Sequence, residues 1–218
     1  MTKSSIIYRL DGVDLAAGFG IHISDSCGIQ DLPALNLSQV YDWPDYHGAI
    51  VDLDKPRYKA RSIILDAWIE TKVGKMDFAR KINAFYTAVC KPGLRQLVNF
   101  LDPADDPLVS MVYMKDGMSV EKKWRDIHMF GKFQMKLEEP EPIKRVIRFA
   151  TTQPAITFRS SDMFNIYWGD GTVDYDVSAD STRTVTHYYP TWGTYYVCFS
   201  GNTDSLTEFS TNGTVIWQ

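Results

Sequence analysis

Three aspartates around one glycine-rich turn are the side chains best placed for chemistry. Asp170 lies within the turn at residues 169–172, and Asp174 and Asp176 follow on the next predicted strand. Carboxylate oxygens are the ligands that Ca²⁺ takes in proteins, so the three could share an ion. Alternation along a strand puts Asp174 and Asp176 on one face, so an ion shared with Asp170 requires a bend. The simpler interpretation is a solvated acidic hairpin, and we expect no bound metal.

Aromatic side chains near an acid are typical of surfaces that bind sugars. Trp192 lies in a turn bounded by proline and glycine, and Tyr188 comes just before that turn. One hypothesis is that Asp170, Tyr188 and Trp192 contact a host-surface glycan. The other is that Trp192 caps the core of its own domain. The aromatic and acidic turn at residues 41–48 presents the same choice between a ligand site and a packed loop.

The sequence lacks the patterns that bring catalytic groups together. It contains no GxSxG elbow, no HExxH, no phosphate-binding loop and no complete GxGxxG. Four histidines are isolated from one another: His22, His47, His128 and His187. Cys27, Cys90 and Cys198 are too far apart for a disulfide framework or a metal site, so buried free thiols are expected. We therefore expect a protein that is not an enzyme and that uses no cofactor.

The charge of the 218-residue chain is unevenly distributed. The net charge is −4, and residues 151–218 hold two basic and seven acidic side chains, or −5. Subtraction leaves 21 basic and 20 acidic residues, or +1, before them. Thr, Ser, Asp, Tyr and Trp also become common after residue 150. The change predicts a boundary between Pro140 and Pro154, with domains at residues 1–145 and 153–218.

Several partners and locations are disfavoured by the same composition. No basic arm of the kind that binds nucleic acid is present. No run approaches the roughly 20 apolar residues of a membrane-spanning helix. The first residues lack the apolar segment of a signal peptide, so synthesis and retention in a cytoplasm are expected.

Residues 55–100 organise the first domain in the order strand, helix, strand. Apolar and polar side chains alternate over residues 61–70, which predicts a half-buried strand. Over residues 75–89 the apolar positions recur at helical spacing, and the Lys-Pro-Gly at 91–93 ends the helix. One helix among many strands most simply plugs or flanks a barrel or sheet.

The rest of the chain is a series of short strands. In the first domain they are predicted at residues 6–10, 13–23, 49–53, 108–114, 118–124 and 127–137. In the second domain they are predicted at residues 156–159, 164–168, 173–177, 182–189 and 194–199, with a further pair in 201–218. Five side chains of the 127–137 strand are expected to face inward: Ile127, Met129, Phe133, Met135 and Leu137. Phe130 is the apolar exception on the outward face. Even spacing with Gly, Pro and Asp turns predicts a small antiparallel, Ig-like β-sandwich for the second domain, so the fold class is mainly β.

An ordered set of loose motifs runs through residues 5–140. They are an Asp11-Gly12 strand, the loop YDWPDYHG, the strand RSIIL, a DFxxKIxAFY helix and the strand PGLRQL. In this order they resemble the N-terminal domain of phage distal tail (Dit-like) proteins, which are baseplate components of siphophages and prophages. The resemblance implies a split β-barrel that assembles into a homohexameric ring in the virion, with other tail or baseplate proteins as partners. It also implies that Ile64 and Trp68 meet a neighbouring subunit or the helix. The alternative is that both pack beneath Phe78 and Phe85.

A second set of motifs lies in residues 153–200. It consists of YWGDGT at 167–172, HYY at 187–189 and GTYYV at 193–197. These resemble the pattern of PKD-like β-sandwich domains, which serve as spacers or adhesion modules. Tyr189 is then expected to have a buried ring and a hydroxyl bonded to the backbone. Together the resemblances predict a structural tail protein with an accessory C-terminal domain. The alternative is a carbohydrate- or cell-surface-binding β-sandwich protein.

Overall fold

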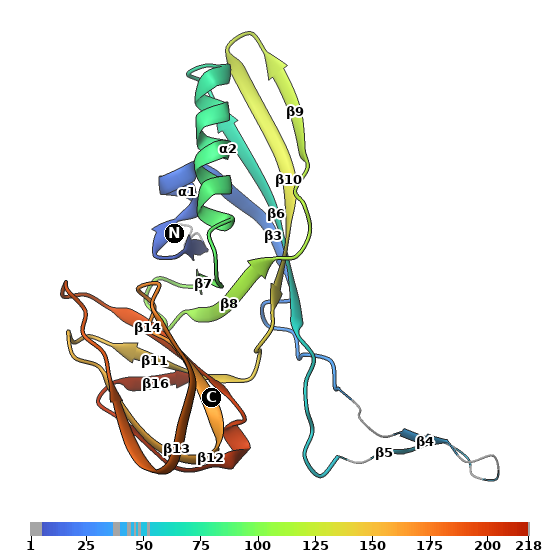
Figure 1. The fold of residues 1–218 in the computed structure, drawn as a ribbon. Coiled ribbons are helices and arrows are strands. Elements are labelled where there is room, and N and C mark those ends of the chain that lie inside the picture. Colours follow the sequence, from blue (N-terminus) through green and yellow to red (C-terminus); the bar gives the residue numbers. More distant parts are fainter. Residues whose placement is uncertain are drawn as a thin grey trace.

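Alternating burial along extended segments gives the chain a mainly β architecture, as the sequence predicts. The computed structural model describes residues 6–36, 40–42, 45, 47, 49–51 and 53–217. Most strands belong to two antiparallel sheets, which define a first unit and a second unit joined by a short linker (Figure 1). A separate hairpin, β4 (Val40–Asp42) with β5 (Ala49–Val51), projects from the first unit.

The first unit is built on an eight-stranded sheet in the order β2-β1-β7-β8-β10-β6-β3, with β9 added beside β10. Its strands are β1 (Ile7–Leu10), β2 (Val13–Asp14), β3 (Ile21–Cys27), β6 (Arg61–Thr71), β7 (Arg95–Phe100), β8 (Leu108–Met114), β9 (Val120–Arg125) and β10 (His128–Glu139). Its helices are α1 (Leu15–Phe19) and α2 (Lys75–Val89). The helix predicted at residues 75–89 is confirmed, and so is the strand that precedes it.

The strand predicted at residues 13–23 is wrong in its middle, where α1 lies. The side chain of Asp14 accepts hydrogen bonds from the backbone N–H groups of Ala16 and Ala17, which caps the start of the helix. Gly20, at φ +69°, ends it in the left-handed conformation.

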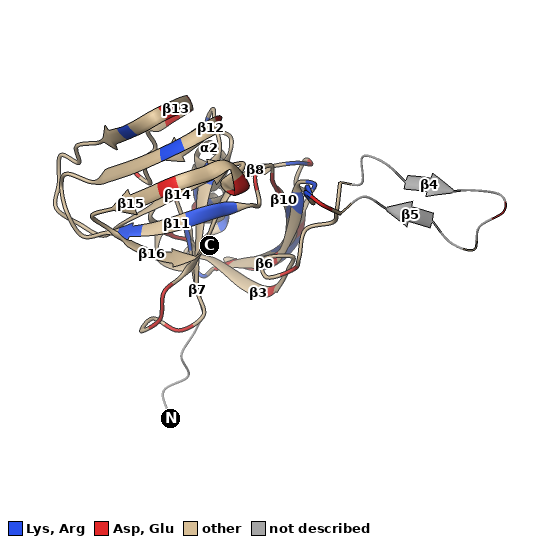
Figure 2. Ribbon diagram, turned by 90° about the horizontal axis from the view of Figure 1, so that it is seen from below, with Lys and Arg blue, Asp and Glu red and all other residues tan. Residues whose placement is uncertain are grey.

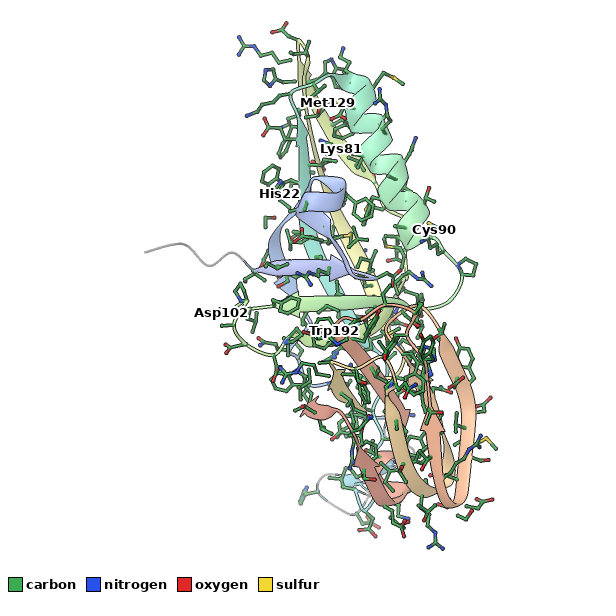
Figure 3. The ribbon with its side chains drawn as sticks, turned by 90° about the vertical axis from the view of Figure 1, so that its left-hand side faces the viewer. His22, Lys81, Cys90, Asp102, Met129 and Trp192 are labelled. Carbon is green, nitrogen blue, oxygen red and sulfur yellow. The ribbon has the colours of Figure 1, made fainter. Side chains whose placement is uncertain are left out.

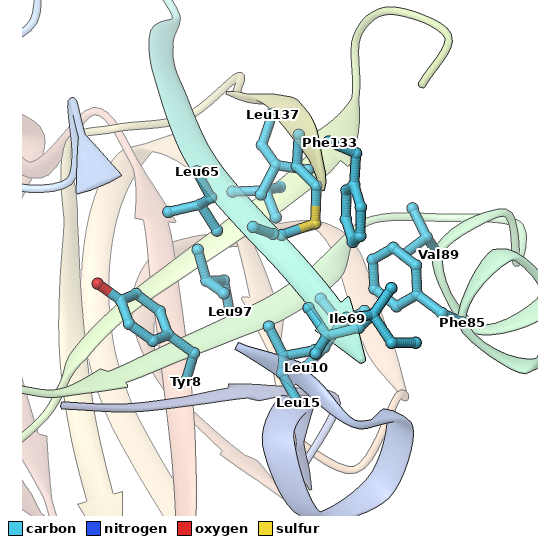
Figure 4. Packing of buried hydrophobic residues seen from close by; sticks show 14 of the residues in the cluster. Tyr8, Leu10, Leu15, Leu65, Ile69, Phe85, Val89, Leu97, Phe133 and Leu137 are labelled. Carbon is cyan, nitrogen blue, oxygen red and sulfur yellow. The ribbon is translucent and has the colours of Figure 1, made fainter. Parts of the chain in front are cut away.

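The core of the first unit lies between α2 and one face of the sheet (Figure 4). The inward residues of β6 are fully buried, namely Ile63, Leu65, Ala67 and Ile69. They meet the apolar stripe of α2, formed by Phe78, Ile82, Phe85 and Val89. Gly131 on β10 permits this packing, since a Cβ there would come within 2.6 Å of the Phe78 ring. Burial of these side chains stabilises the unit by roughly 1.5–3 kcal/mol for each large one.

The second unit is a six-stranded sheet in the order β13-β12-β14-β11-β16, with β15 also paired to β12. Its strands are β11 (Lys144–Phe149), β12 (Ala155–Tyr167), β13 (Val173–Thr186), β14 (Tyr195–Gly201), β15 (Leu206–Thr211) and β16 (Thr214–Trp217). A short 3-10 turn, η1 (Thr203–Ser205), precedes β15. Stacked and edge-on rings of Phe158, Phe164 and Phe199 fill its core.

Two pairs of predicted strands in this unit are single long strands. β12 covers the 156–159 prediction and all but the last residue of the 164–168 prediction. β13 covers the 173–177 prediction and most of the 182–189 prediction. The pairing of β12 with β13 shifts register between Phe158 and Ile166, so β12 remains one strand through its polar middle. On its other edge, β12 pairs first with β15 and then with β14.

Ile127 does not face inward, in contrast to the sequence prediction. It follows Asp126, whose φ of +55° makes the tight turn between β9 and β10, so its side chain is exposed at the turn. The other predicted inward side chains of β10 pack on or within the core.

The two units are held together by apolar contacts and by the linker. β7 and β8 contribute Val98 and Met111 to a cluster that also contains Val146, Tyr167 and Cys198 of the second unit. Trp217 adds a hydrogen bond from its indole N–H to the Pro107 carbonyl, at 2.7 Å. β11 lies across the predicted boundary and pairs with β14 and β16 of the second sheet.

Two glutamates anchor the linker. The Glu139 carboxylate is fully buried and accepts from Arg61 Nε at 2.9 Å and from Lys144 Nζ. The Glu141 carboxylate accepts from Asn165 Nδ2 at 2.7 Å and from two hydroxyl groups of the second unit. The linker is therefore bonded to both units.

Candidate assembly face and candidate ligand loop

Ile64 and Trp68 lie on the face of β6 that points away from α2. Their neighbours Ile63, Leu65 and Ala67 are buried beneath the helix, and strand alternation turns the next residues outward. The alternative that Ile64 and Trp68 pack beneath the phenylalanines of α2 is therefore wrong. Neither residue meets the helix, so both remain candidates for contact with another molecule.

Three rings stack across this outer face. The indole of Trp68 lies 4.4 Å from the imidazole of His22 on β3 and 5.9 Å from the ring of Phe130 on β10, centre to centre. Figure 3 shows His22 on the side of the sheet away from the helix. Cross-strand pairing produces the row, since Trp68 is opposite both His22 and Lys132. The result is a half-exposed aromatic ladder on a sheet face.

The charges of the outer face are sorted by strand. Cations lie at one side, with Lys123 on β9 and Lys132 and Lys136 on β10. Anions lie at the other side: Asp66 and Glu70 on β6 and Asp25 on β3. The exceptions are Glu121 of β9 and Glu138 of β10, and the latter is paired with Lys115. Gln134 Nε2 donates to Asp66 Oδ1 at 3.0 Å at the boundary. The face thus has a basic side and an acidic side.

Both lateral ends of this face are strand edges. Within the described residues, β3 pairs with β6 alone and β9 pairs with β10 alone. Their outer N–H and C=O groups are available to a strand of another chain. β3 has seven residues and β9 has six, so the two edges match in length.

The Asp170 carboxylate forms hydrogen bonds with residues of its own unit. It accepts from Thr172 N at 2.9 Å and from Thr172 Oγ1 at 2.5 Å, while Oδ2 lies 2.8 Å from His187 Nε2. Burial opposes ionisation and is the largest single influence on its pKa. The hydrogen bonds from Thr172 and His187 together outweigh burial and hold the pKa of Asp170 below its usual range. Asp170 therefore fixes the turn rather than facing outward as a free ligand contact.

The residues around that turn form a rigid aromatic support. Tyr189 is buried, and its hydroxyl donates to the Trp168 carbonyl at 2.6 Å, as the sequence predicts. Its ring stacks on Tyr195 with centres 3.6 Å apart, and Trp168 stacks on His187. Gly169, at φ +83°, is required because a Cβ would lie 2.5 Å from the Tyr196 carbonyl oxygen.

Asp174 and Asp176 do not join Asp170 in a cation site. The Asp174 carboxylate accepts a hydrogen bond from the indole N–H of Trp168 at 2.9 Å, which joins the two sides of the hairpin. In the part of the chain that the structure describes, no three His, Cys, Asp or Glu side chains converge as a metal site would require.

Tyr188 and Trp192 are exposed on the loop between β13 and β14. Their exposed fractions are 65% and 77%, so Trp192 does not cap the core of its unit. A cavity of about 260 Å³ between the two units is lined by Asp170 together with Arg95 and Gln96, but not by Tyr188 or Trp192. The structure thus leaves two predicted aromatic contacts accessible and separates them from this cavity. Their role in ligand binding stays a prediction.

The three cysteines differ in burial. Cys27 and Cys90 are exposed, so the expectation of three buried thiols is wrong for these two. Cys198 is buried, and burial raises its pKa to about 12. Half of the aromatic turn at 41–48, namely residues 43, 44, 46 and 48, lies outside the described residues. No helix in the described ranges has the length and apolarity needed to cross a bilayer.

Sequence patterns point to some members of these sites and miss others. Phe130 stands out as an apolar residue on an otherwise polar strand face, and this is the signal for the ladder. His22 carries no such signal because its neighbour Trp68 is remote in sequence. The burial of Glu139 is likewise missed, since its partners Arg61 and Lys144 are brought to it only by the fold.

Comparisons with known proteins concern the whole chain. No family model matches it, and no curated protein matches it. Among solved structures it is similar to the Dit protein of phage SPP1, described as a paradigm of the hub adsorption apparatus in phages that infect Gram-positive bacteria. The match has a TM-score of 0.50 and 12% identity, and it covers 97% of this chain and 85% of the SPP1 protein. At this identity the likeness is one of fold, and the fold that this chain shares is that of a phage Dit protein.

Proposed function

We propose that the protein is a structural component of a phage or prophage tail, at the distal tail or baseplate. It acts by assembling into a homohexameric ring of split-barrel first units at the tail tip. The second unit is an outward PKD-like spacer or adhesion module, and other tail proteins are the partners. The observation that carries the proposal is the fold likeness to the SPP1 Dit protein over 97% of the chain.

The outer face and the strand edges support a particular contact within the ring. A closed ring repeats one heterologous interface, so the surfaces that meet must differ and complement each other. The β9 edge is bordered by Lys123 and Lys132, and the β3 edge by Asp25 and Asp66. Pairing of β9 with the β3 of the next copy would join basic to acidic sides. It would also place His22 of the aromatic ladder at the junction, with Trp68 stacked on it from β6, one strand in from the edge.

The chemistry of the described sites fits assembly rather than turnover. The carboxylates of Asp170 and Glu139 are occupied by hydrogen bonds and ion pairs within the fold. A role as scaffold requires a surface and no catalytic group. On this proposal the protein functions in the virion without a cofactor.

Native mass spectrometry over a concentration series, followed by negative-stain imaging, tests the proposal. The wild type is expected to form a ring. Trp68→Glu is expected to remain a folded monomer because it removes the indole that stacks on His22 of the β3 edge and changes the charge beside the contact. Trp192→Glu is the matched control, since its indole is exposed on the other unit, and it should still assemble. Rings that persist in Trp68→Glu would remove this face from the interface.

A carbohydrate- or surface-binding function is the second candidate, favoured by the exposure of Tyr188 and Trp192. Two exposed rings on one loop offer stacking surfaces for sugar rings. Binding on a glycan array that is lost in Trp192→Ala and retained in Trp124→Ala would support this candidate. Binding unchanged by Trp192→Ala would remove the residue from the site.

A further inference from the structure

Four large apolar side chains are exposed at the end of the first unit farthest from the second unit. We name them the tip patch: Val73, Met76, Trp124 and Ile127, with exposed fractions of 82%, 69%, 64% and 59%. They lie at two connections: Val73 and Met76 where β6 passes into α2, and Trp124 and Ile127 where β9 passes into β10. Figure 1 shows both connections at that same end of the unit.

The two connections lie side by side because β10 runs between β6 and β9. Met129 pairs with Trp124 on one side and with Thr71 on the other, and it packs on the end of the core. Thr71 donates to the Asp77 carboxylate at 2.7 Å and accepts from the N–H of Val73 at 3.3 Å, which orders the connection from β6 to α2. Adjacent strands lie about 4.8 Å apart, so the patch spans on the order of 10 Å. Figure 3 shows Met129 at this end, beside the start of α2.

The tip patch is surrounded by unpaired cations. In the described residues Lys75, Lys122, Lys123 and Arg125 form no ion pair, against the two unpaired anions Glu121 and Asp126. The residues before 151 carry +1 overall, whereas residues 151–218 carry −5. An approaching anionic surface would therefore meet this end of the molecule and not the second unit. In the second unit the two signs of charge are interspersed (Figure 2).

We propose that the tip patch docks on the surface of an anionic lipid bilayer. Trp124 and Ile127 sit at or beside a turn, so they protrude rather than line a hollow that could receive a partner's side chain. Protruding apolar groups enter the headgroup region without needing shape complementarity, and tryptophan favours that region. The Lys and Arg side chains then lie level with the lipid phosphates. This contact goes beyond the proposed tail function and does not depend on a ring.

Vesicle co-sedimentation tests the proposal. The probe is vesicles of phosphatidylcholine with about one third phosphatidylglycerol, compared with vesicles of phosphatidylcholine alone. We expect binding to the anionic vesicles only, weakened by added salt. Trp124→Ala with Ile127→Ser should reduce partitioning by about tenfold or more, given the apolar area withdrawn from the lipid. Trp192→Ala, which removes the exposed indole of the acidic unit, should leave it unchanged.

A fluorescence measurement separates insertion from charge attraction alone. The emission difference between wild type and Trp124→Phe isolates this indole among six tryptophans, and it should shift to the blue with anionic vesicles. Circular dichroism confirms that each variant is folded. Absence of binding to anionic vesicles, or equal loss in Trp192→Ala, would overturn the proposal. Lipid-free assembly that Trp124→Ala abolishes would also overturn it, because the patch would then be a protein contact.

Discussion

The indole of Trp68 and the imidazole of His22 stack with centres 4.4 Å apart on the sheet face opposite α2. The two residues are 46 positions apart in the chain, and antiparallel pairing of β3 with β6 sets them opposite each other. Stacked rings on an open sheet face are stabilised further when another surface covers them. This relationship places an aromatic row on the outer face, which is the face that we propose to lie beside the contact between copies.

Enlarging Gly131 should destabilise the first unit. In Gly131→Ala the new methyl group would lie 2.6 Å from the Phe78 ring, so α2 or the ring must shift. We expect a loss of about 1–3 kcal/mol in the free energy of unfolding by urea. Gly117→Ala is the control, because its Cβ would meet open space. Equal effects of the two substitutions would contradict the packing of α2 on β10.

Neutralising Glu139 should lower the free energy of unfolding, because its carboxylate holds Arg61 and Lys144 together at the linker. Glu139→Gln leaves Arg61 and Lys144 buried without their shared counter-charge. Breaking a buried ion pair in this way costs about 3–5 kcal/mol. Asp116→Asn removes an exposed partner of Lys136 and should cost about 1 kcal/mol or less. Both values come from urea unfolding, and a small loss in Glu139→Gln would show that the linker is not held by these pairs.

Stability should depend on pH through Asp170. Its folded pKa lies below its ordinary value of 3.8, so the stability it adds is present above that value and is lost as pH falls through the folded pKa. Asp170→Asn should therefore be less stable than wild type at neutral pH, and the gap should narrow below about pH 4. Asp180→Asn, at an exposed position of β13, serves as the control. A gap that stays constant from neutral to acid pH would rule out this role for the carboxylate.

The three thiols should differ in reactivity. Cys27 and Cys90 are exposed and should react quickly with Ellman's reagent in the folded protein. Cys198 is buried with its pKa raised to about 12, so it should react only on unfolding. Three fast thiols in the native protein would contradict the burial of Cys198.

Local patterns predict the central elements well because one face of each is buried against the core. The alternation over residues 61–70 and the helical spacing over 75–89 reflect the contact between β6 and α2 directly. Tyr189 is likewise predicted with its buried ring and backbone bond, since the motif around it sets a local turn.

Features that depend on distant partners could not be predicted in this way. The continuity of β12 depends on β14 and β15 taking over from each other along its length. The exposure of Ile127 depends on a positive φ at Asp126, which alternation alone does not reveal. Trp192 is exposed because the stacked rings of Tyr189 and Tyr195 already occupy the adjacent part of the core.

A designed disulfide across the proposed interface tests the ring most directly. Cys27 is exposed on the outer face of the β3 edge, and Lys123→Cys places a thiol on the outer face of the β9 edge. The variant also carries Cys90→Ser, and its control has Lys122→Cys, which faces the opposite side of the sheet. After mild oxidation we predict a ladder of covalent oligomers that ends at the hexamer, absent from the control. No intermolecular disulfide, or a ladder without an end, would contradict a closed ring formed through these edges.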